Sequence, residues 1–298
     1  TKMKNTIFTG AGVAIVTPMD KNGEIDYQMF GQLIDYNIDN GTDAIIVCGT
    51  TGESATMTDE EHIEAIKFTV NKVNKRVPVI AGTGSNDTAY ALKLSIEAQE
   101  LGADALLIVT PYYNKTSQAG LVKHFTVIAD AVDIPIILYN IPGRTGINME
   151  VSTIKELSNH KNIVAVKEAS GNISYVAKLI AECGESIDVY SGNDDQIIPI
   201  MSLGGKGVIS VISNCMPFET HEICALCLEN RYDEARAKAY GLLEFTNNLF
   251  LDVNPVPIKE ALNIMGFNVG ECRLPLYKMS DSTREKLKTS MQKIGLVK

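Results

Sequence analysis

The sequence predicts a (β/α)8 barrel of the α/β class, a TIM barrel, with a C-terminal helical extension. Eight short apolar runs alternate with longer amphipathic segments along residues 12–229. The apolar runs are rich in Val and Ile and largely lack polar alternation, which is typical of parallel strands buried on both faces. A doubly wound open sheet is the alternative, but eight evenly spaced units favour closure, and 298 residues leave room for a barrel of ~250.

The predicted strands share this composition and this spacing. They cover residues 12–17, 44–48, 77–81, 105–110, 134–139, 163–167, 187–190 and 207–211. The segments between them have helical periodicity and cover residues 26–40, 58–74, 88–101, 117–131, 150–158, 173–183, 194–203 and 217–229.

Local signals mark the ends of several predicted helices. Asp26 suits the N-cap of the first helix. Thr58 and Glu61 form a capping-box pattern at the start of the second. Gly41 and Gly102 lie where helix C-caps are expected. These signals support the alternation of strands and helices independently of the apolar runs.

After residue 230 the strand pattern stops, and helices are predicted at 231–251, 256–265 and 282–294. We therefore expect a barrel domain at residues 1–230 and a helical region at residues 231–298 that packs on it. No linker composition, low-complexity tract or longer repeat is present. The sequence leaves open whether these helices form an interface or brace the barrel.

The composition is that of an ordinary globular protein, with 45% hydrophobic and 21% charged residues. The net charge of −9 argues against nucleic acid and anionic membranes as partners, but not against a small anionic substrate. The six cysteines are scattered, as in proteins of a reducing compartment. No signal segment or membrane-spanning run is apparent, so we expect a cytoplasmic protein. Whether Thr1 and Lys2, before Met3, belong to the native chain is left open.

Lys167 is the most informative candidate for catalysis. It ends the predicted strand 163–167, so its side chain should rise toward the carboxyl end of the barrel, where such folds place their active sites. Partial burial disfavours the charged form of an amine, and a neutral amine can attack a ketone to give an imine. The alternative is a lysine that extends to solvent and pairs with Glu168, and spacing alone does not decide between the two.

Three further strand ends carry polar groups. Tyr139 ends the preceding strand and could transfer protons through a hydrogen-bond relay, although a rim tyrosine is the simpler reading. Thr50 and Thr51 lie in a glycine-flanked turn that could hold a carboxylate, or could be an ordinary tight turn. Arg144 lies in a Gly-Arg-Thr-Gly loop and suits a second carboxylate, although isolated loop arginines are more often solvated.

Several other patterns are weak. Gly82-Thr83-Gly84 lacks the third glycine of a dinucleotide-binding motif. His221, Cys224 and Cys227 lie on one predicted helix without a second ligand pair, so we expect no metal. None of the four histidines ends a strand, which argues against a nucleophile–histidine triad. Asp194-Asp195 suits the start of a helix.

The sequence resembles the dihydrodipicolinate synthase family, within the pyruvate-lyase superfamily that includes N-acetylneuraminate lyase. The resemblance runs nearly end to end through eight ordered blocks: GVAIVTP, GTTGES, PVIAGTGSN, VTPYYNK, ILYNIPGRTG, VAVKEASG, YSGNDD and GVISV. It implies a lyase that condenses pyruvate with L-aspartate 4-semialdehyde to give 4-hydroxy-tetrahydrodipicolinate, toward diaminopimelate and lysine. It implies no metal and no organic cofactor.

The resemblance also implies a role for each candidate residue. Lys167 forms the Schiff base with pyruvate, and Tyr139, Thr50 and Tyr113 relay protons, with Tyr113 reaching in from a neighbouring subunit. The substrate-binding residues implied are Thr51 for the pyruvate carboxylate, Arg144 for the second substrate, and Gly192 and Ile209 through their backbone carbonyls. The family's usual assembly is a homotetramer made of two tight dimers.

Some relatives are inhibited by lysine at a dimer-interface pocket. The residues that match this pocket are Ser54, Ala55, His62, Asn86, Tyr90 and Tyr112. Tyr90 stands where lysine-sensitive relatives carry a glutamate, and Asp59 replaces a histidine found in some. Loss of that carboxylate removes a charge-assisted partner of the ligand's ammonium, so we expect weak or absent feedback.

Two other functions compete with this one. A sister pyruvate aldolase could act on a sugar acid such as N-acetylneuraminate or a keto-deoxy acid, but the Thr50-Thr51 pair, the double tyrosine and the Arg144 loop favour the first reading. A non-catalytic barrel would require an incomplete catalytic set, whereas all of the implied residues are present.

Overall fold

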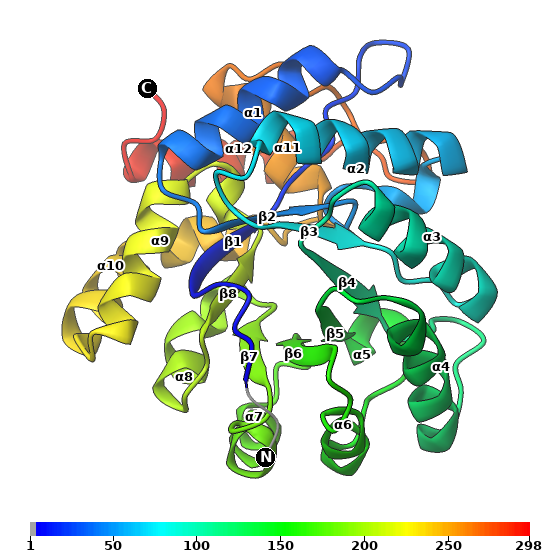
Figure 1. The fold of residues 1–298 in the computed structure, drawn as a ribbon. Helices are drawn as coiled ribbons and strands as arrows, with labels where there is room; N and C mark the ends of the chain where they lie inside the picture. Colours follow the sequence, from blue (N-terminus) through cyan, green and yellow to red (C-terminus); the bar gives the residue numbers. More distant parts are fainter. Residues whose placement is uncertain (1–3) are drawn as a thin grey trace.

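The protein is described by a computed structural model, which describes residues 4–298. The origin of Thr1 and Lys2 therefore concerns residues outside the described part. Eight parallel strands form a closed barrel in sequence order, surrounded by helices (Figure 1). The strands are β1 Gly10–Ala14, β2 Ala44–Val47, β3 Val79–Gly82, β4 Ala105–Val109, β5 Ile136–Asn140, β6 Ile163–Glu168, β7 Asp188–Ser191 and β8 Gly207–Ser210. The predicted fold class is confirmed.

The strands begin or end up to three residues away from their predicted limits, and two of these differences have an identifiable reason. The apolar run of β1 continues to Val16, but the backbone N–H of Val16 donates to the Asn214 side chain instead of to a strand, so the ladder ends at Ala14. β3 begins only at Val79. It follows Pro78, which has no N–H to donate to a ladder.

The helices follow the predicted alternation. They are α1 Tyr27–Asp39, α2 Asp59–Val73, α3 Thr88–Glu100, α4 Gln118–Ala131, α5 Pro142–Thr145, α6 Val151–Leu157, α7 Ile173–Cys183, α8 Ile197–Ser202, α9 Pro217–Leu228, α10 Tyr232–Asn248, α11 Val256–Met265 and α12 Asp281–Lys293. The Asp26 cap and the capping box at Thr58 and Glu61 are both present. Gly41 and Gly102 follow α1 and α3 with positive φ, as expected of residues that end helices.

Two segments differ from the predicted elements. Pro142–Thr145, read as a loop, forms the one-turn helix α5. The predicted helix 194–203 begins with a 3₁₀ turn at Asp194–Gln196, and α8 follows it. The Asp194 carboxylate accepts hydrogen bonds from the backbone N–H groups of Val211 and Ile212, so it caps the turn after β8.

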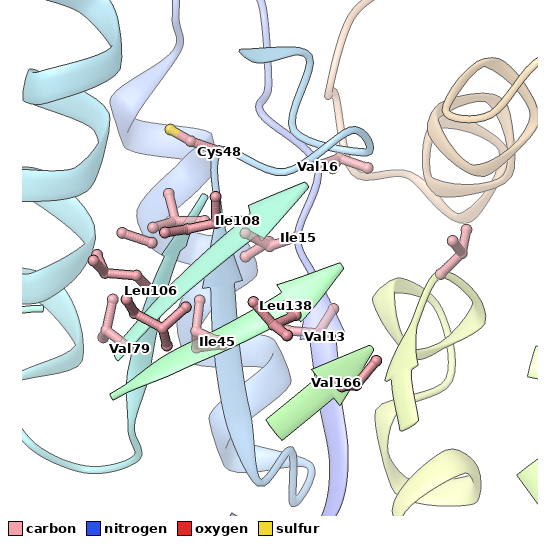
Figure 2. Close-up of a cluster of buried hydrophobic side chains, with 14 of the residues drawn as sticks. Val13, Ile15, Val16, Ile45, Cys48, Val79, Leu106, Ile108, Leu138 and Val166 are labelled. Atoms are coloured by element: carbon pink, nitrogen blue, oxygen red, sulfur yellow. The ribbon is translucent and has the colours of Figure 1, made fainter. Parts of the chain in front are cut away.

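The core has two layers separated by the strands. Outward-facing side chains such as Ile45, Leu106, Leu138 and Val166 pack against the helices (Figure 2). Alternate residues point into the barrel and fill it, as in other barrels of this type. At the amino end, the ring of Phe8 stacks on that of Tyr190 with centroids 4.4 Å apart, and the Tyr190 hydroxyl donates to the Phe8 carbonyl.

No helix in the described part of the chain combines the length and apolarity that crossing a bilayer requires. All six cysteines are free thiols, and five of them are buried.

Candidate active site

A cavity of about 460 Å³ lies at the carboxyl ends of the strands. Thr50, Tyr139 and Arg144 line it, together with residues of the segment that precedes α11. The turn after β2, the end of β5 and the helix α5 therefore meet at one cavity, as the barrel fold requires of catalytic residues from different strands.

Lys167 enters the same end of the barrel. The register of β5 and β6 pairs Tyr139 with Lys167, and the period of two directs both side chains inward while Leu138 and Val166 point outward. The Lys167 Nζ lies 4.0 Å from the centroid of the Tyr139 ring, an attractive cation–π geometry, and the side chain is buried.

The alternative reading of Lys167 is wrong, because Glu168 lies on the opposite face of β6. Its carboxylate accepts hydrogen bonds from the Asn140 side chain at 2.9 Å and from the backbone and hydroxyl of Ser170. Burial raises the pKa of Glu168, and these hydrogen bonds partly offset that rise. Lys167 is thus not neutralised by its sequence neighbour.

Gly192 and Ile209 lie near this pair. A Cβ on Gly192 would come within 3.2 Å of the Lys167 Cε and 2.7 Å of the Ala169 Cβ, so the absence of a side chain gives the lysine stem its space. Ile209 is buried in the barrel interior in the same cluster as Tyr139. Their backbone carbonyls remain candidates for substrate contact.

The turn that carries Thr50 and Thr51 is closely held. Gly52 and Glu53 donate backbone hydrogen bonds to Gly49 and Thr50 at 3.1 and 3.0 Å. Thr51 is buried, and its Oγ1 accepts a hydrogen bond of 2.9 Å from the side-chain nitrogen of Asn254. A hydroxyl that accepts from one side keeps its own proton for another acceptor.

Arg144 begins from an exposed position on α5 and reaches the same asparagine. Its Nη2 donates to the backbone carbonyl of Asn254 at 3.1 Å. Asn254, between α10 and α11, therefore contacts both Thr51 and Arg144. We did not predict this residue from the sequence. The one signal nearby was Pro255, which separates two predicted helices.

A buried ion pair supports the turn from the other side. Lys259 on α11 and Glu53 lie 2.6 Å apart, and each side chain is only 2% exposed. The second oxygen of Glu53 accepts from the backbone N–H of Arg273, and Lys259 also donates to the Glu271 carbonyl. The pair is thus satisfied by further hydrogen bonds, as a buried ion pair must be. Neither residue of this pair was predicted from the sequence.

Tyr113 lies apart from this set. Its side chain is 90% exposed, its backbone has a φ of 71°, and it is not among the residues lining the cavity. Within one chain the structure does not bring Tyr113 to Lys167.

Five of the six candidate regulatory residues belong to the lining of the same cavity. Ser54, Ala55, His62, Tyr90 and Tyr112 line it. Asn86 is not among the lining residues, and its backbone carbonyl accepts a hydrogen bond from the Asn114 side chain.

The charged groups next to Tyr90 are already paired. The Tyr90 hydroxyl donates to the Asp59 carboxylate at 2.5 Å, and Lys93 lies 3.1 Å from its second oxygen. The hydrogen bond from Tyr90, followed by that from Lys93, lowers the pKa of Asp59. Burial and the bond to Asp59 raise the pKa of Tyr90.

Two of the histidines have structural partners. His221 binds Asp43 at 2.7 Å, and the His62 ring nitrogen lies 2.7 Å from the Gly82 carbonyl. Among residues 4–298, no cluster of His, Cys, Asp and Glu has the arrangement of a metal site.

Comparison with known proteins gives consistent matches over nearly the whole chain. The profile of the dihydrodipicolinate synthetase family matches residues 7–294. The 4-hydroxy-tetrahydrodipicolinate synthase of Acetivibrio thermocellus is 54% identical over 295 residues, which cover 99% of this chain and 100% of that protein.

Solved structures that match this chain belong to the same family. The chloride-inhibited dihydrodipicolinate synthase of Acinetobacter baumannii, complexed with pyruvate, has a TM-score of 0.96 and 41% identity over 98% of this chain and 100% of that one. A dihydrodipicolinate synthase described as a monomeric variant has a TM-score of 0.95 and 40% identity, with 98% of each chain covered.

Proposed function

Because this chain belongs to the dihydrodipicolinate synthetase family, we propose that it condenses pyruvate with L-aspartate 4-semialdehyde to give 4-hydroxy-tetrahydrodipicolinate. It is a lyase of the route to diaminopimelate and lysine. The structural observation that carries the proposal is the buried Lys167 amine, 4.0 Å from the Tyr139 ring at the carboxyl end of a barrel.

Lys167 is the proposed nucleophile. Its neutral amine attacks the ketone carbon of pyruvate, and the resulting carbinolamine loses water to give an imine. Each step moves a proton, and the Tyr139 hydroxyl beside the amine exchanges it through Thr50 and the Tyr113 of a neighbouring subunit. Support for this relay is that Tyr139 and Thr50 line one cavity.

The remaining candidates hold the two substrates. The Thr51 hydroxyl and the backbone of its turn bind the pyruvate carboxylate. Loss of a methyl proton from the imine gives an enamine, whose carbon bonds to the aldehyde carbon of the second substrate. Arg144 binds the carboxylate of that substrate, and the carbonyls of Gly192 and Ile209 contact the bound intermediate. Attack of the substrate's amine on the imine carbon closes the ring and releases Lys167.

We further propose a homotetramer built from two tight dimers, in which Tyr113 completes the neighbouring site. The support is that aromatic and aliphatic side chains are exposed in two loops, the loop after β4 and the loop before α12: Tyr112, Tyr113, Leu274 and Tyr277. Tyr113 and Leu274 are 90% and 75% exposed in the single chain. Large apolar side chains of this kind mark interfaces. The free thiols support a cytoplasmic location.

We propose that lysine inhibits this enzyme weakly or not at all. Tyr90 places a phenol where a carboxylate would bind the ligand's ammonium, and the nearby Asp59 is engaged by Tyr90 and Lys93. The missing partner costs the complex about 1.5–3 kcal/mol. A lysine titration of the steady-state rate should show little effect below millimolar concentration. Half-inhibition at submillimolar lysine would contradict this proposal.

A coupled assay tests the proposed reaction directly. The protein should consume pyruvate only when L-aspartate 4-semialdehyde is present, and should not cleave N-acetylneuraminate or a keto-deoxy acid. Cleavage of a sugar acid without activity on the semialdehyde would favour the sister aldolase instead. The names of the relatives support the condensing enzyme.

A further inference from the structure

Asn254 was not predicted as a site residue, yet it contacts two of the predicted ones directly, Thr51 and Arg144. It belongs to the chain between α10 and α11, more than two hundred residues from the turn after β2, yet it is 7% exposed and lines the cavity. Its side-chain nitrogen donates to the Thr51 hydroxyl at 2.9 Å, and its backbone carbonyl accepts from Arg144 at 3.1 Å.

From these contacts we infer that Asn254 is a positioning residue for the pyruvate carboxylate, acting by fixing the direction in which the Thr51 hydroxyl donates its proton. The inference rests on the proposed function, in which Thr51 binds that carboxylate. It adds a residue of the C-terminal region to the machinery of the barrel.

The hydrogen-bonding capacity of the two side chains determines where the Thr51 proton points. A threonine hydroxyl has one proton to donate and can accept from other donors. When the Asn254 amide nitrogen donates to Thr51 Oγ1, that oxygen acts as the acceptor and its own proton remains available for an anion. If an acceptor took the place of the amide nitrogen, the Thr51 proton would turn toward it and away from the substrate.

The other half of the amide shows that this orientation carries a cost. Among residues 4–298, the Asn254 side-chain oxygen is buried without a hydrogen-bond partner. A buried unsatisfied acceptor is unfavourable. In the described part of the chain, the one hydrogen bond of the Asn254 side chain is therefore the one it donates to Thr51, and this bond leaves the Thr51 proton free for an anion.

The contact with Arg144 allows an effect on pyruvate binding to be distinguished from an effect on binding of the second substrate. It uses the backbone carbonyl of Asn254, which every side-chain variant retains. Replacing the Asn254 side chain should therefore weaken pyruvate binding and leave binding of the second substrate nearly unchanged. A merely structural defect would change both, because Thr51 and Arg144 lie on different elements that meet at this residue.

Steady-state kinetics of Asn254→Ala and Asn254→Asp test the inference. We expect the KM for pyruvate to rise about tenfold in Asn254→Ala, through loss of one oriented hydrogen bond to a charged group. It should rise about a hundredfold in Asn254→Asp, whose carboxylate accepts the Thr51 proton and repels the substrate. The KM for the semialdehyde should change less than threefold in both. Asn254→Asp is nearly isosteric, so it decides the question if Asn254→Ala does not fold.

Thr51→Val tests whether Asn254 affects pyruvate binding through the Thr51 hydroxyl. In the Thr51→Val background, Asn254→Ala should cause no further rise in the pyruvate KM, because the hydroxyl it orients is gone. Equal pyruvate KM values in wild type and both Asn254 variants, or fully additive effects in the double variant, would overturn the inference. Absence of condensing activity in the wild type would instead refute the proposed function, so the two failures are distinguishable.

Discussion

Lys167 and Tyr139 face each other because they are paired across neighbouring strands and share the inward face. The end of an apolar strand was enough to predict that Lys167 reaches the carboxyl end of the barrel. It was not enough to exclude pairing with Glu168. That decision depends on which face Glu168 occupies and on the hydrogen bonds it finds with Asn140 and Ser170.

Two buried histidines set a pH dependence of stability. Burial lowers the pKa of both His62 and His124 below its ordinary value. As the pH falls through ~6.5, the unfolded chain binds protons at these positions before the folded chain does. The free energy of unfolding should therefore fall below about pH 6.5, with each histidine contributing at most ~1.4 kcal/mol per pH unit.

His124→Gln isolates one of these contributions, since His124 is not among the residues lining the cavity. Within residues 4–298, the one hydrogen bond of its side chain joins a ring nitrogen to the Thr88 hydroxyl at 2.8 Å. Urea unfolding at pH 7.5 and pH 5.5 should show a smaller loss of stability on acidification in the variant than in the wild type. Parallel losses in the two proteins would show that His124 is not responsible.

At the scale of the elements, helix caps and strand alternation could be predicted because they depend on residues a few positions apart. The capping box of α2 and the N-cap of α1 are examples. Predictions of element limits and of side-chain partners failed where a group distant in the sequence takes a hydrogen-bond partner. Asn214 takes the N–H of Val16 from the β1 ladder. Asp194 does open a helical turn as predicted, but its carboxylate also accepts from the backbone of the turn after β8, which was not predicted.

The ion pair between Glu53 and Lys259 joins the turn after β2 to α11, and its removal should be costly. Lys259→Met leaves the buried Glu53 carboxylate without its counter-ion, which should lower the free energy of unfolding by about 3–5 kcal/mol. Chemical denaturation measures this change.

Lys293→Met serves as the matched control, because the pair of Lys293 and Glu244 is more than half exposed and should contribute less than about 1 kcal/mol. The double variant Glu53→Gln/Lys259→Met should recover part of the loss. A cost for Lys259→Met no larger than that for Lys293→Met would argue against the importance of the buried pair.

At the scale of the whole molecule, the helical region after residue 230 supplies Asn254 and Lys259 to the turn that carries Thr51. We propose that residues 1–230 and 231–298 form one functional unit, in which the helical region braces the active site. The sequence could not predict this, since these contacts join residues about two hundred positions apart and neither partner carries a local signal.

Assembly is the other property of the whole molecule that bears on activity. If Tyr113 completes a neighbouring site, activity per chain should fall on dilution in step with dissociation, before the barrel unfolds. Sedimentation and turnover measured over the same concentrations check this. Tyr113→Phe should lower turnover without dissociating the assembly. A monomer with full activity at equilibrium would contradict the proposed role.

Reduction with borohydride in the presence of pyruvate, followed by peptide mass mapping, tests the central claim most directly. The account predicts one covalent adduct, on the peptide that contains Lys167, and none in Lys167→Ala. An unmodified Lys167 in the folded protein, or an adduct on another lysine, would contradict it.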